Sequence, residues 1–168
     1  MKNTTLCYIR QGEQYLMLHR VKKRNDLNED KWIGVGGKCE ENESPEECLL
    51  RECREETGLT LKRWRYRGLV TFVSDRWEGE YMHLYTADRF DGEIGPCDEG
   101  VLEWIGLREL RRLHLWEGDH IFLDLLEADA PFFSLKLEYE GERLVYAALE
   151  GQPLDLPWRG VPGSDSIK

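Results

Sequence analysis

The strongest constraint in this sequence is a helix whose start and end are both marked. Ser44, followed by Pro45 and Glu47, forms a capping box with proline at the first helical position, which satisfies two backbone amides at a helix start. Gly58 can adopt the left-handed conformation that commonly ends helices. The sequence therefore predicts a helix over Pro45–Thr57.

One face of that helix carries three carboxylates. Glu52, Glu55 and Glu56 follow the i, i+3, i+4 spacing that places side chains on one side of a helix. Leu49 and Cys53 occupy the neighbouring arc and are expected to face the core. Like charges at this spacing repel by a few tenths of a kcal/mol per pair, so a bound cation would stabilise them. An acidic helix face can also be simply solvated, and the spacing alone does not decide between the two.

The residues around the helix extend the pattern from Gly37 to Leu59. They fit the motif G-x5-E-x7-R-E-U-x-E-E-x-G-U, in which U is a bulky apolar residue. The chain therefore resembles the Nudix hydrolases, although Cys53 stands where that family prefers a larger apolar side chain. The resemblance implies an α+β fold in which a mixed β-sheet is sandwiched between helices. It also implies hydrolysis of a phosphoanhydride in a nucleoside diphosphate-linked substrate.

A divalent metal site follows from the same resemblance. Oxygen ligands suit hard cations such as Mg²⁺, with Mn²⁺ as an alternative. The implied ligands are the Gly36 carbonyl and the carboxylates of Glu52, Glu55, Glu56 and Glu99. In the family the metal neutralises the phosphates and activates a water. Asp98 could replace Glu99 as the ligand, and a surface loop without function is a further reading of that pair.

Arg51 and Glu43 occupy the motif positions that, by the resemblance, pair to orient the helix against its loop. A catalytic role for Arg51 stays open, although the structural role is favoured. Two glycines at Gly36-Gly37 indicate a tight turn, and a backbone without side chains can also approach metal and phosphate. Lys38 can add a positive contact to the phosphates.

Beyond the motif, residues 4–149 resemble the MutT-like enzymes that hydrolyse oxidised purine nucleoside triphosphates such as 8-oxo-dGTP. The matching segments include Lys22-Lys23-Arg24, Lys31-Trp32, Asp98-Glu99, Trp104, and Trp116 with Asp119. The resemblance implies that Trp116 stacks on the base and that Asp119 hydrogen-bonds the purine edge. A proton-donating carboxyl can distinguish oxidised from normal guanine there. Core packing for Trp116 and helix N-capping for Asp119 are the alternatives.

The other residues that we expect at the substrate are Lys22, Leu27, Ile33 and Lys38. Two positions depart from the relatives. Ile33 stands where the related enzymes have a base-reading asparagine, and Gly118 stands where they have a second aspartate. The resemblance therefore supports the reaction more strongly than the choice of base.

Composition narrows the classes of partner. The formal net charge is -10, from 33 acidic and 23 basic residues, and such a surface repels polyanions such as DNA. The 5 cysteines are odd in number and lack CxxC spacing, so we expect reduced thiols rather than disulfides or a zinc site. Neither a signal peptide nor a membrane-spanning stretch is apparent. We therefore expect a cytoplasmic protein with a small nucleotide substrate and no nucleic-acid or membrane partner.

Alternating and helical patterns outline one domain over residues 1–150. The expected strands are 4–8 and 15–19 as a hairpin around Gly12-Glu13, then 64–74, 80–88, 101–105, 132–139 and 143–149. A polar loop is expected over 25–30, and further helices over 107–113 and 119–128. Glycine, proline and aspartate dominate residues 151–168, which we expect to be a loosely held tail.

Three functions are compatible with these patterns. The first is a Mg²⁺-dependent pyrophosphohydrolase that converts oxidised purine nucleoside triphosphates such as 8-oxo-dGTP to the monophosphate and pyrophosphate. The second keeps the chemistry but uses ADP-ribose, a dinucleoside polyphosphate or another nucleoside diphosphate-linked substrate. The third is a non-catalytic nucleotide sensor, which the retention of all the motif glutamates disfavours. The sequence does not distinguish a monomer from a homodimer.

Overall fold

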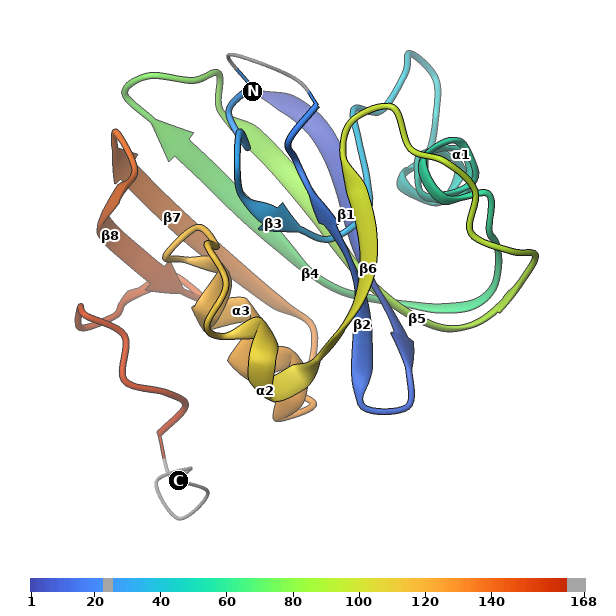
Figure 1. The fold of residues 1–168 in the computed structure, drawn as a ribbon. Coiled ribbons are helices and arrows are strands. Elements are labelled where there is room, and N and C mark those ends of the chain that lie inside the picture. The colour runs from blue at the N-terminus through green and yellow to red at the C-terminus, as the bar shows by residue number, and fades with distance from the viewer. Residues whose placement is uncertain (23–25, 163–168) are drawn as a thin grey trace.

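The computed structural model describes residues 1–22 and 26–162 (Figure 1). In those residues the strands are β1 (Lys2–Gln11), β2 (Gln14–His19), β3 (Trp32–Ile33), β4 (Thr60–Ser74), β5 (Glu80–Asp91), β6 (Val101–Gly106), β7 (Phe133–Glu140), β8 (Arg143–Leu149) and β9 (Gln152–Pro153). The helices are α1 (Pro45–Thr57), α2 (Leu107–Leu110) and α3 (Asp119–Glu127). Lys23, Arg24, Asn25 and residues 163–168 of the expected segments lie outside the described residues.

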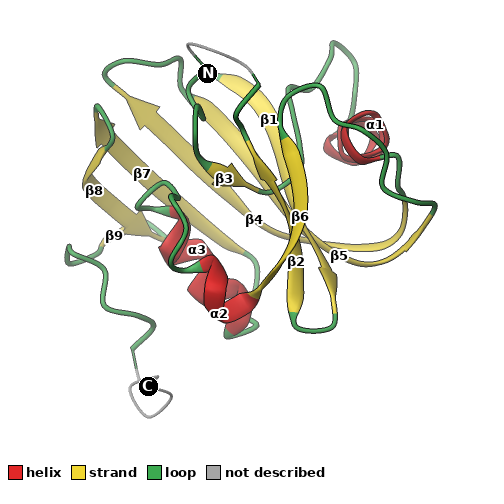
Figure 2. Ribbon diagram, in the orientation of Figure 1, coloured by secondary structure: helices red, strands yellow, loops and turns green. Residues whose placement is uncertain are grey.

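The strands form a mixed sheet in the order β3-β2-β1-β5-β4-β7-β8-β9, and β6 pairs with β2 off this path. The β1–β5 and β4–β7 pairs are parallel, whereas the neighbouring pairs are antiparallel. Figure 2 shows α1 on one side of the sheet and α2 and α3 on the other. The α+β fold with a sheet between helices, expected from the sequence, is therefore confirmed.

Alternation along β1 separates two hydrophobic cores. Cys7 and Ile9 are fully buried with Leu49 and Cys53 of α1, while Tyr8 between them is buried with Phe122 of α3. Successive side chains of a strand point to opposite faces, so one strand contributes to both cores. The two helices that carry site residues are thereby fixed on a common sheet.

Helix α1 has the bounds that its capping residues predict. The Glu47 amide donates to Ser44 Oγ at 3.1 Å, and the Ser44 amide donates to Glu47 Oε1 at 2.9 Å. Gly58 has a φ of 82° and its amide closes the last turn on the Arg54 carbonyl. The start of the acidic helix is therefore set by local hydrogen bonds.

Several segments differ from the sequence expectation, including β1 and β5, which are each longer than expected. Strand β4 begins at Thr60, directly after the helix cap, and α2 ends at Leu110, after which the chain turns. The expected loose tail is ordered as far as the structure describes it. Strand β9 pairs with β8, and Trp158 Nε1 donates to Asp124 Oδ2 at 2.7 Å. Apolar side chains of the tail supply packing that its glycine and proline content does not reveal.

No helix in the described part of the chain has the length and apolar character needed to cross a bilayer. The 5 cysteines are free thiols.

Candidate active site

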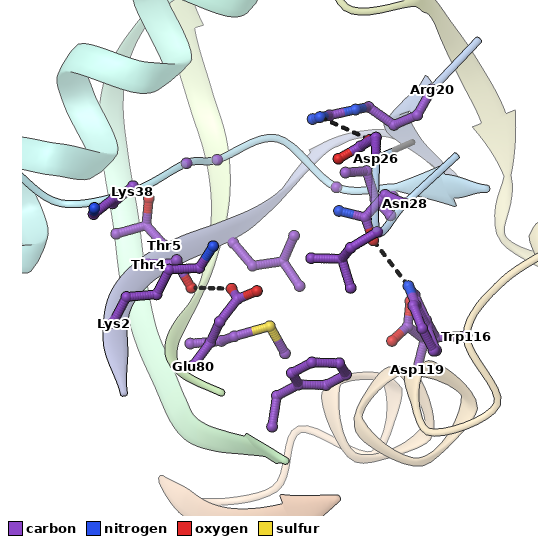
Figure 3. Close-up of a pocket in the computed structure, with 18 of the residues that line it drawn as sticks. Lys2, Thr4, Thr5, Arg20, Asp26, Asn28, Lys38, Glu80, Trp116 and Asp119 are labelled. Atoms are coloured by element: carbon purple, nitrogen blue, oxygen red, sulfur yellow. Dashed lines mark hydrogen bonds and ion pairs between the residues drawn. The ribbon is translucent and has the colours of Figure 1, made fainter. Parts of the chain in front are cut away.

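A cleft of about 340 Å³ opens beside the start of β1, between the glycine loop before α1 and the start of α3 (Figure 3). The cleft gathers segments from both halves of the chain. Of the residues expected from sequence, Leu27, Ile33, Gly36, Lys38, Glu52, Glu99, Trp116 and Asp119 line it. Glu52 of the acidic helix therefore shares one cavity with the expected base-binding residues, whereas Arg51, Glu55 and Glu56 do not line it.

The glycine loop lies so close to its neighbours that side chains are excluded. A Cβ at Gly36 would lie 1.9 Å from the Thr5 carbonyl oxygen, and a Cβ at Gly37 would lie 2.4 Å from Glu52 Cδ. The Thr5 amide donates to the Gly37 carbonyl at 2.8 Å. Glycine is therefore required here because the loop passes between β1 and the carboxylate of Glu52.

Glu56 is the most buried of the helix carboxylates. Its side chain accepts a hydrogen bond from the Gly36 amide at 3.0 Å, while Oε2 is buried without a partner among the described residues. Burial raises the pKa of Glu56 to about 8, the negative charges of Glu99 and Glu52 add to the rise, and the Gly36 amide opposes it. The ionised carboxylate is therefore poorly compensated by protein groups alone.

The other two helix carboxylates contact Arg51. Its Nη1 donates to Glu52 at 2.8 Å and to Glu55 at 3.3 Å. The Glu55 side chain is 58% exposed and does not line the cleft, whereas that of Glu52 is 17% exposed and does. Burial raises the pKa of Glu52, and Arg51 acts in the opposite direction.

Arg51 also joins the helix to its preceding loop. Its guanidinium donates two hydrogen bonds to the Glu43 carboxylate, from Nε at 2.6 Å and from Nη2 at 2.9 Å. Nη2 also donates to the Lys38 carbonyl at 3.1 Å. The Arg51 hydrogen bonds lower the pKa of Glu43 to about 2. This geometry matches an orienting pair, the structural role that the sequence favours for Arg51.

The acidic face suits a hard cation in donor type and charge. The orphaned Glu56 Oε2 and the mutual repulsion of Glu52, Glu56 and Glu99 are features that a divalent ion would relieve. In residues 1–22 and 26–162, no three Asp, Glu, His or Cys side chains lie close enough together to hold a metal ion. Arg51 holds Glu52 and Glu55 instead, so these side chains would have to move to share a cation.

Glu99 reaches the cleft from the loop before β6. Its Oε2 accepts from Arg20 Nη1 at 2.9 Å, and Arg20 Nη2 pairs with Asp26 at 2.9 Å. Arg20, whose side chain is 9% exposed, therefore fixes two carboxylates at the cleft wall. Glu99, not its neighbour Asp98, is the member of that acidic pair that lines the cleft.

The far end of the cleft holds Trp116 and Asp119. Trp116 is 6% exposed, its Nε1 donates to Asn28 Oδ1 at 2.8 Å, and the Lys31 ammonium lies 4.4 Å from its ring centroid. Asp119 is also buried, which raises its pKa to about 8, while Lys31 acts in the opposite direction. Trp116 thus belongs to the core and also lines the cleft, and burial favours the neutral form of Asp119.

Asp119 does not cap helix α3. Gly118 occupies the N-cap position, and no side-chain capping bond is present at this helix start. A Cβ at Gly118 would lie 2.5 Å from Leu137 Cδ1 and 2.7 Å from the Tyr139 hydroxyl, which accepts the Gly118 amide. An aspartate at Gly118 would therefore require the side chains of Leu137 and Tyr139 to shift, and the packing here is suited to glycine.

One expected substrate residue lies elsewhere. The Lys22 ammonium donates to the Cys97 carbonyl at 2.8 Å, and Lys22 does not line the cleft. A basic run has no periodicity from which the direction of each side chain could be inferred. Lys38 and Ile33 do line the cleft, on the loop side.

Several cleft residues were not singled out from the sequence. They are Thr4, Arg20, Asp26, Asn28, Glu80 and Tyr139. The parallel pairing of β1 with β5 brings Thr4 and Glu80 together across the sheet. No local motif marks such residues, since only the strand order makes them neighbours.

Comparison with known proteins gives the family. The NUDIX domain matches residues 2–126, which is most of the chain. The chain belongs to the Nudix family. It is a Nudix hydrolase, an enzyme type that acts on phosphoanhydrides of small nucleotide substrates and generally uses divalent metals such as Mg²⁺.

Relatives of this Nudix hydrolase carry several names. The uncharacterized Nudix hydrolase YvcI of Bacillus subtilis is 28% identical over 131 residues, covering 75% of this chain and 79% of the relative. The oxidized purine nucleoside triphosphate hydrolase of Danio rerio is 30% identical over 105 residues, covering 62% and 67%. The NAD-capped RNA hydrolase NudC of Vibrio parahaemolyticus is 29% identical over 106 residues, covering 61% and 37%.

A solved MutT protein from Bacillus halodurans has the same architecture. It superposes with a TM-score of 0.78 at 26% identity, covering 91% of this chain and 100% of that one. The resemblance to MutT-like enzymes seen in the sequence is therefore confirmed at the level of family and fold.

Proposed function

We propose that this Nudix hydrolase is a Mg²⁺-dependent pyrophosphohydrolase of oxidised purine nucleoside triphosphates, 8-oxo-dGTP among them. The products are the nucleoside monophosphate and pyrophosphate. The observation that carries the proposal is that Glu52, from the acidic face of α1, lines the same cleft as the buried carboxyl of Asp119, whose pKa burial raises to about 8.

Asp119 supports an oxidised base. Oxidation of a purine at C8 adds a carbonyl oxygen and converts N7 from an acceptor to an N–H donor. A neutral carboxyl can donate through its hydroxyl and accept through its carbonyl, so it complements such a mixed edge. Burial keeps Asp119 in that neutral form, as in other sites where an apolar environment holds a carboxylic acid protonated.

Trp116 supports a purine. Its ring is fixed edge-on by Tyr139, with ring centroids 4.8 Å apart, and by the hydrogen bond to Asn28. A rigid aromatic wall stacks on a base without losing side-chain freedom on binding. The oxidized purine nucleoside triphosphate hydrolase among the relatives supports the same substrate class.

At the phosphate end the chain supplies orientation and charge. Glu52 and Glu99, which line the cleft, would hold the divalent ion together with Glu55 and Glu56 of the same helix face, which do not line it, and with the Gly36 backbone beside them. A bound Mg²⁺ supplies charge neutralisation of the phosphates and lowers the pKa of a water. Lys38 can contact the phosphates from the loop, and Arg51 keeps that loop against α1 through the Lys38 carbonyl.

A second candidate is a nucleoside diphosphate-linked substrate such as ADP-ribose, a dinucleoside polyphosphate or the cap of an NAD-capped RNA. Ile33 and Gly118 favour it, because neither residue offers a side chain that hydrogen-bonds a guanine. The NudC relatives fit this alternative.

A panel assay separates the two candidates. The protein is incubated with Mg²⁺ and 8-oxo-dGTP, the four dNTPs, ADP-ribose, NAD or a diadenosine polyphosphate, and the products are resolved by chromatography. We expect the highest kcat/KM for 8-oxo-dGTP or another oxidised purine. A higher value for ADP-ribose or a dinucleotide would replace the first proposal with the second.

A further inference from the structure

Glu80 is a buried carboxylate of the cleft to which the reaction described above assigns no task. It is 7% exposed, and its Oε1 accepts a hydrogen bond from Thr4 Oγ1 at 2.9 Å. Within the described residues, Oε2 has no hydrogen bond, and Glu80 forms no ion pair. Replacing a buried charge of this kind by an apolar side chain is often neutral or stabilising, so packing does not explain its presence.

The groups around Glu80 only partly stabilise the negative charge of its carboxylate. Burial raises the pKa of Glu80, and the charges of Glu78 and Asp26 add to the rise. The Thr4 hydroxyl and the Lys2 ammonium act in the opposite direction. A ligand that donates hydrogen bonds would complete the shell of this carboxylate.

The sheet places Glu80 between the two ends of the cleft. Its hydrogen-bond partner Thr4 forms a bridge with Lys38, at the phosphate end. On the other side, Glu80 pairs in register with Phe72, whose ring lies edge-on to Trp116 with centroids 5.6 Å apart. Figure 3 shows Glu80 between Lys38 on one side and Trp116 with Asp119 on the other.

In a nucleotide the group between phosphates and base is the sugar. We propose that Glu80 binds the sugar hydroxyls of the substrate and makes the enzyme prefer ribonucleotides to 2′-deoxyribonucleotides. The inference rests on the proposed function, from which it takes the phosphate end and the base end of the cleft.

The chemistry of the carboxylate fits this task. Adjacent 2′ and 3′ hydroxyls present two donors, and an acidic side chain that accepts from ribose hydroxyls is a recurrent solution in nucleotide-binding proteins. Thr4 fixes one carboxylate oxygen of Glu80 and leaves the other turned into the cleft (Figure 3). Thr4 is therefore a positioning residue, which acts through Glu80.

The first test compares sugars at constant base. Values of kcat/KM are measured for 8-oxo-GTP and 8-oxo-dGTP, and dissociation constants for GMP and dGMP are measured by calorimetry. We expect the ribonucleotide to be favoured by about tenfold, the effect of one hydrogen bond to a charged group. Equal values for both sugars, a preference for the deoxy form, or no detectable binding of GMP would overturn the assignment.

The second test uses matched variants. In Glu80→Gln the ratio of kcat/KM for 8-oxo-GTP to that for 8-oxo-dGTP should fall from about ten to about one. The change should come from a higher KM for the ribonucleotide, with kcat nearly unchanged. Thr4→Val should reduce the preference partly. The exposed neighbour provides the control, because Glu78→Gln should leave the preference intact. A ribose preference that survives Glu80→Gln would assign sugar recognition to another residue.

The monophosphate titrations keep this inference separate from the proposed function. If oxidised purines are not turned over but GMP binds more tightly than dGMP in a manner that depends on Glu80, the oxidised-base proposal fails and the sugar assignment stands. If oxidised purines are turned over without sugar preference, the oxidised-base proposal stands and the sugar assignment fails. Circular dichroism of each variant confirms that the sheet is retained.

Discussion

The Gly36 amide donates a hydrogen bond to Glu56 Oε1 at 3.0 Å, and this contact joins the glycine loop to the acidic face of α1. Glu56 Oε2 is buried and has no partner among the residues that the structure describes. A backbone amide orients the carboxylate without neutralising it, so its remaining oxygen is available to a cation. The first prediction follows from that arrangement.

Glu56→Gln should lower kcat by on the order of 10²–10³ while the protein stays folded, because the change removes metal-binding charge and little volume. Thermal unfolding with and without Mg²⁺ provides a second readout. Mg²⁺ should raise the Tm of the wild type by binding the folded state, and the rise should shrink in the variant. Glu41→Gln, on the exposed loop, is the control. Near-normal rates in Glu56→Gln would remove Glu56 from the metal site.

Arg51→Lys should impair both stability and turnover. Lysine cannot reproduce the two-point contact with Glu43, and it also loses the bond to the Lys38 carbonyl. We expect the free energy of unfolding to fall by on the order of 1 kcal/mol. Arg54→Lys on the same helix, where the side chain is exposed, should change little. If Arg51→Lys keeps its Tm and loses only kcat, Arg51 acts on the reaction directly.

Trp116→Phe tests stacking without emptying the core. Trp116→Ala would open a cavity that costs about 3–5 kcal/mol, so a loss of binding could not be separated from unfolding. Phenylalanine keeps an aromatic ring but loses the hydrogen bond to Asn28. KM for purine substrates should rise several-fold with a small change in kcat. The matched control is Trp104→Phe, in the other core, and an unchanged KM in Trp116→Phe would leave Trp116 a packing residue.

Asp119 predicts a pH dependence with a definite sign. Its pKa is about 8 in the folded protein against an ordinary value of 3.8, so the folded state holds the proton more tightly. The stability of the wild type should therefore decline as the pH rises from about 4 to about 8. Asp119→Asn should weaken that decline without removing it, because the pKa of buried Glu56 is also raised to about 8 and contributes with the same sign. Thermal unfolding of both proteins at several pH values measures the difference.

The same carboxyl should govern substrate recognition. For an oxidised purine, kcat/KM should fall as the pH rises through about 8, because ionised Asp119 loses its donor. Asp119→Asn should abolish this limb of the profile. A limb that persists in the variant would assign the titration to a different group.

Helix α1 was predictable to its end residues because its determinants are local. Ser44, Pro45, Glu47 and Gly58 act within one turn of the positions they define, and the structure retains each of these contacts. The family motif then added the roles of the glutamates. The helix bounds and the spacing of the glutamates depend on about twenty consecutive residues, so they can be predicted from local sequence alone.

The base and sugar ends of the cleft were less predictable because they depend on strand order. Glu80 and Thr4 meet only through the parallel β1–β5 pair, and Asn28 meets Trp116 across 88 positions of sequence. Alternation predicts that a strand exists but not its neighbour. The contact of Lys22 with the Cys97 carbonyl was not predictable either, because the basic run around Lys22 has no periodicity.

The tail provides the converse case. Its glycines and prolines indicate weak local structure, yet Trp158 hydrogen-bonds Asp124 of α3 and neighbouring apolar residues pack on the core. Tertiary contacts determine the conformation of the tail, and these contacts cannot be predicted from its composition.

The central claim is that one cleft combines phosphoanhydride hydrolysis with recognition of an oxidised purine. Its most direct test is the ratio of kcat/KM for 8-oxo-dGTP to that for dGTP, with Mg²⁺ at neutral pH. We predict a ratio on the order of ten or more, since leaving one buried hydrogen-bonding group unpaired costs about 1–3 kcal/mol. A ratio near one, or no turnover of 8-oxo-dGTP, would contradict the account.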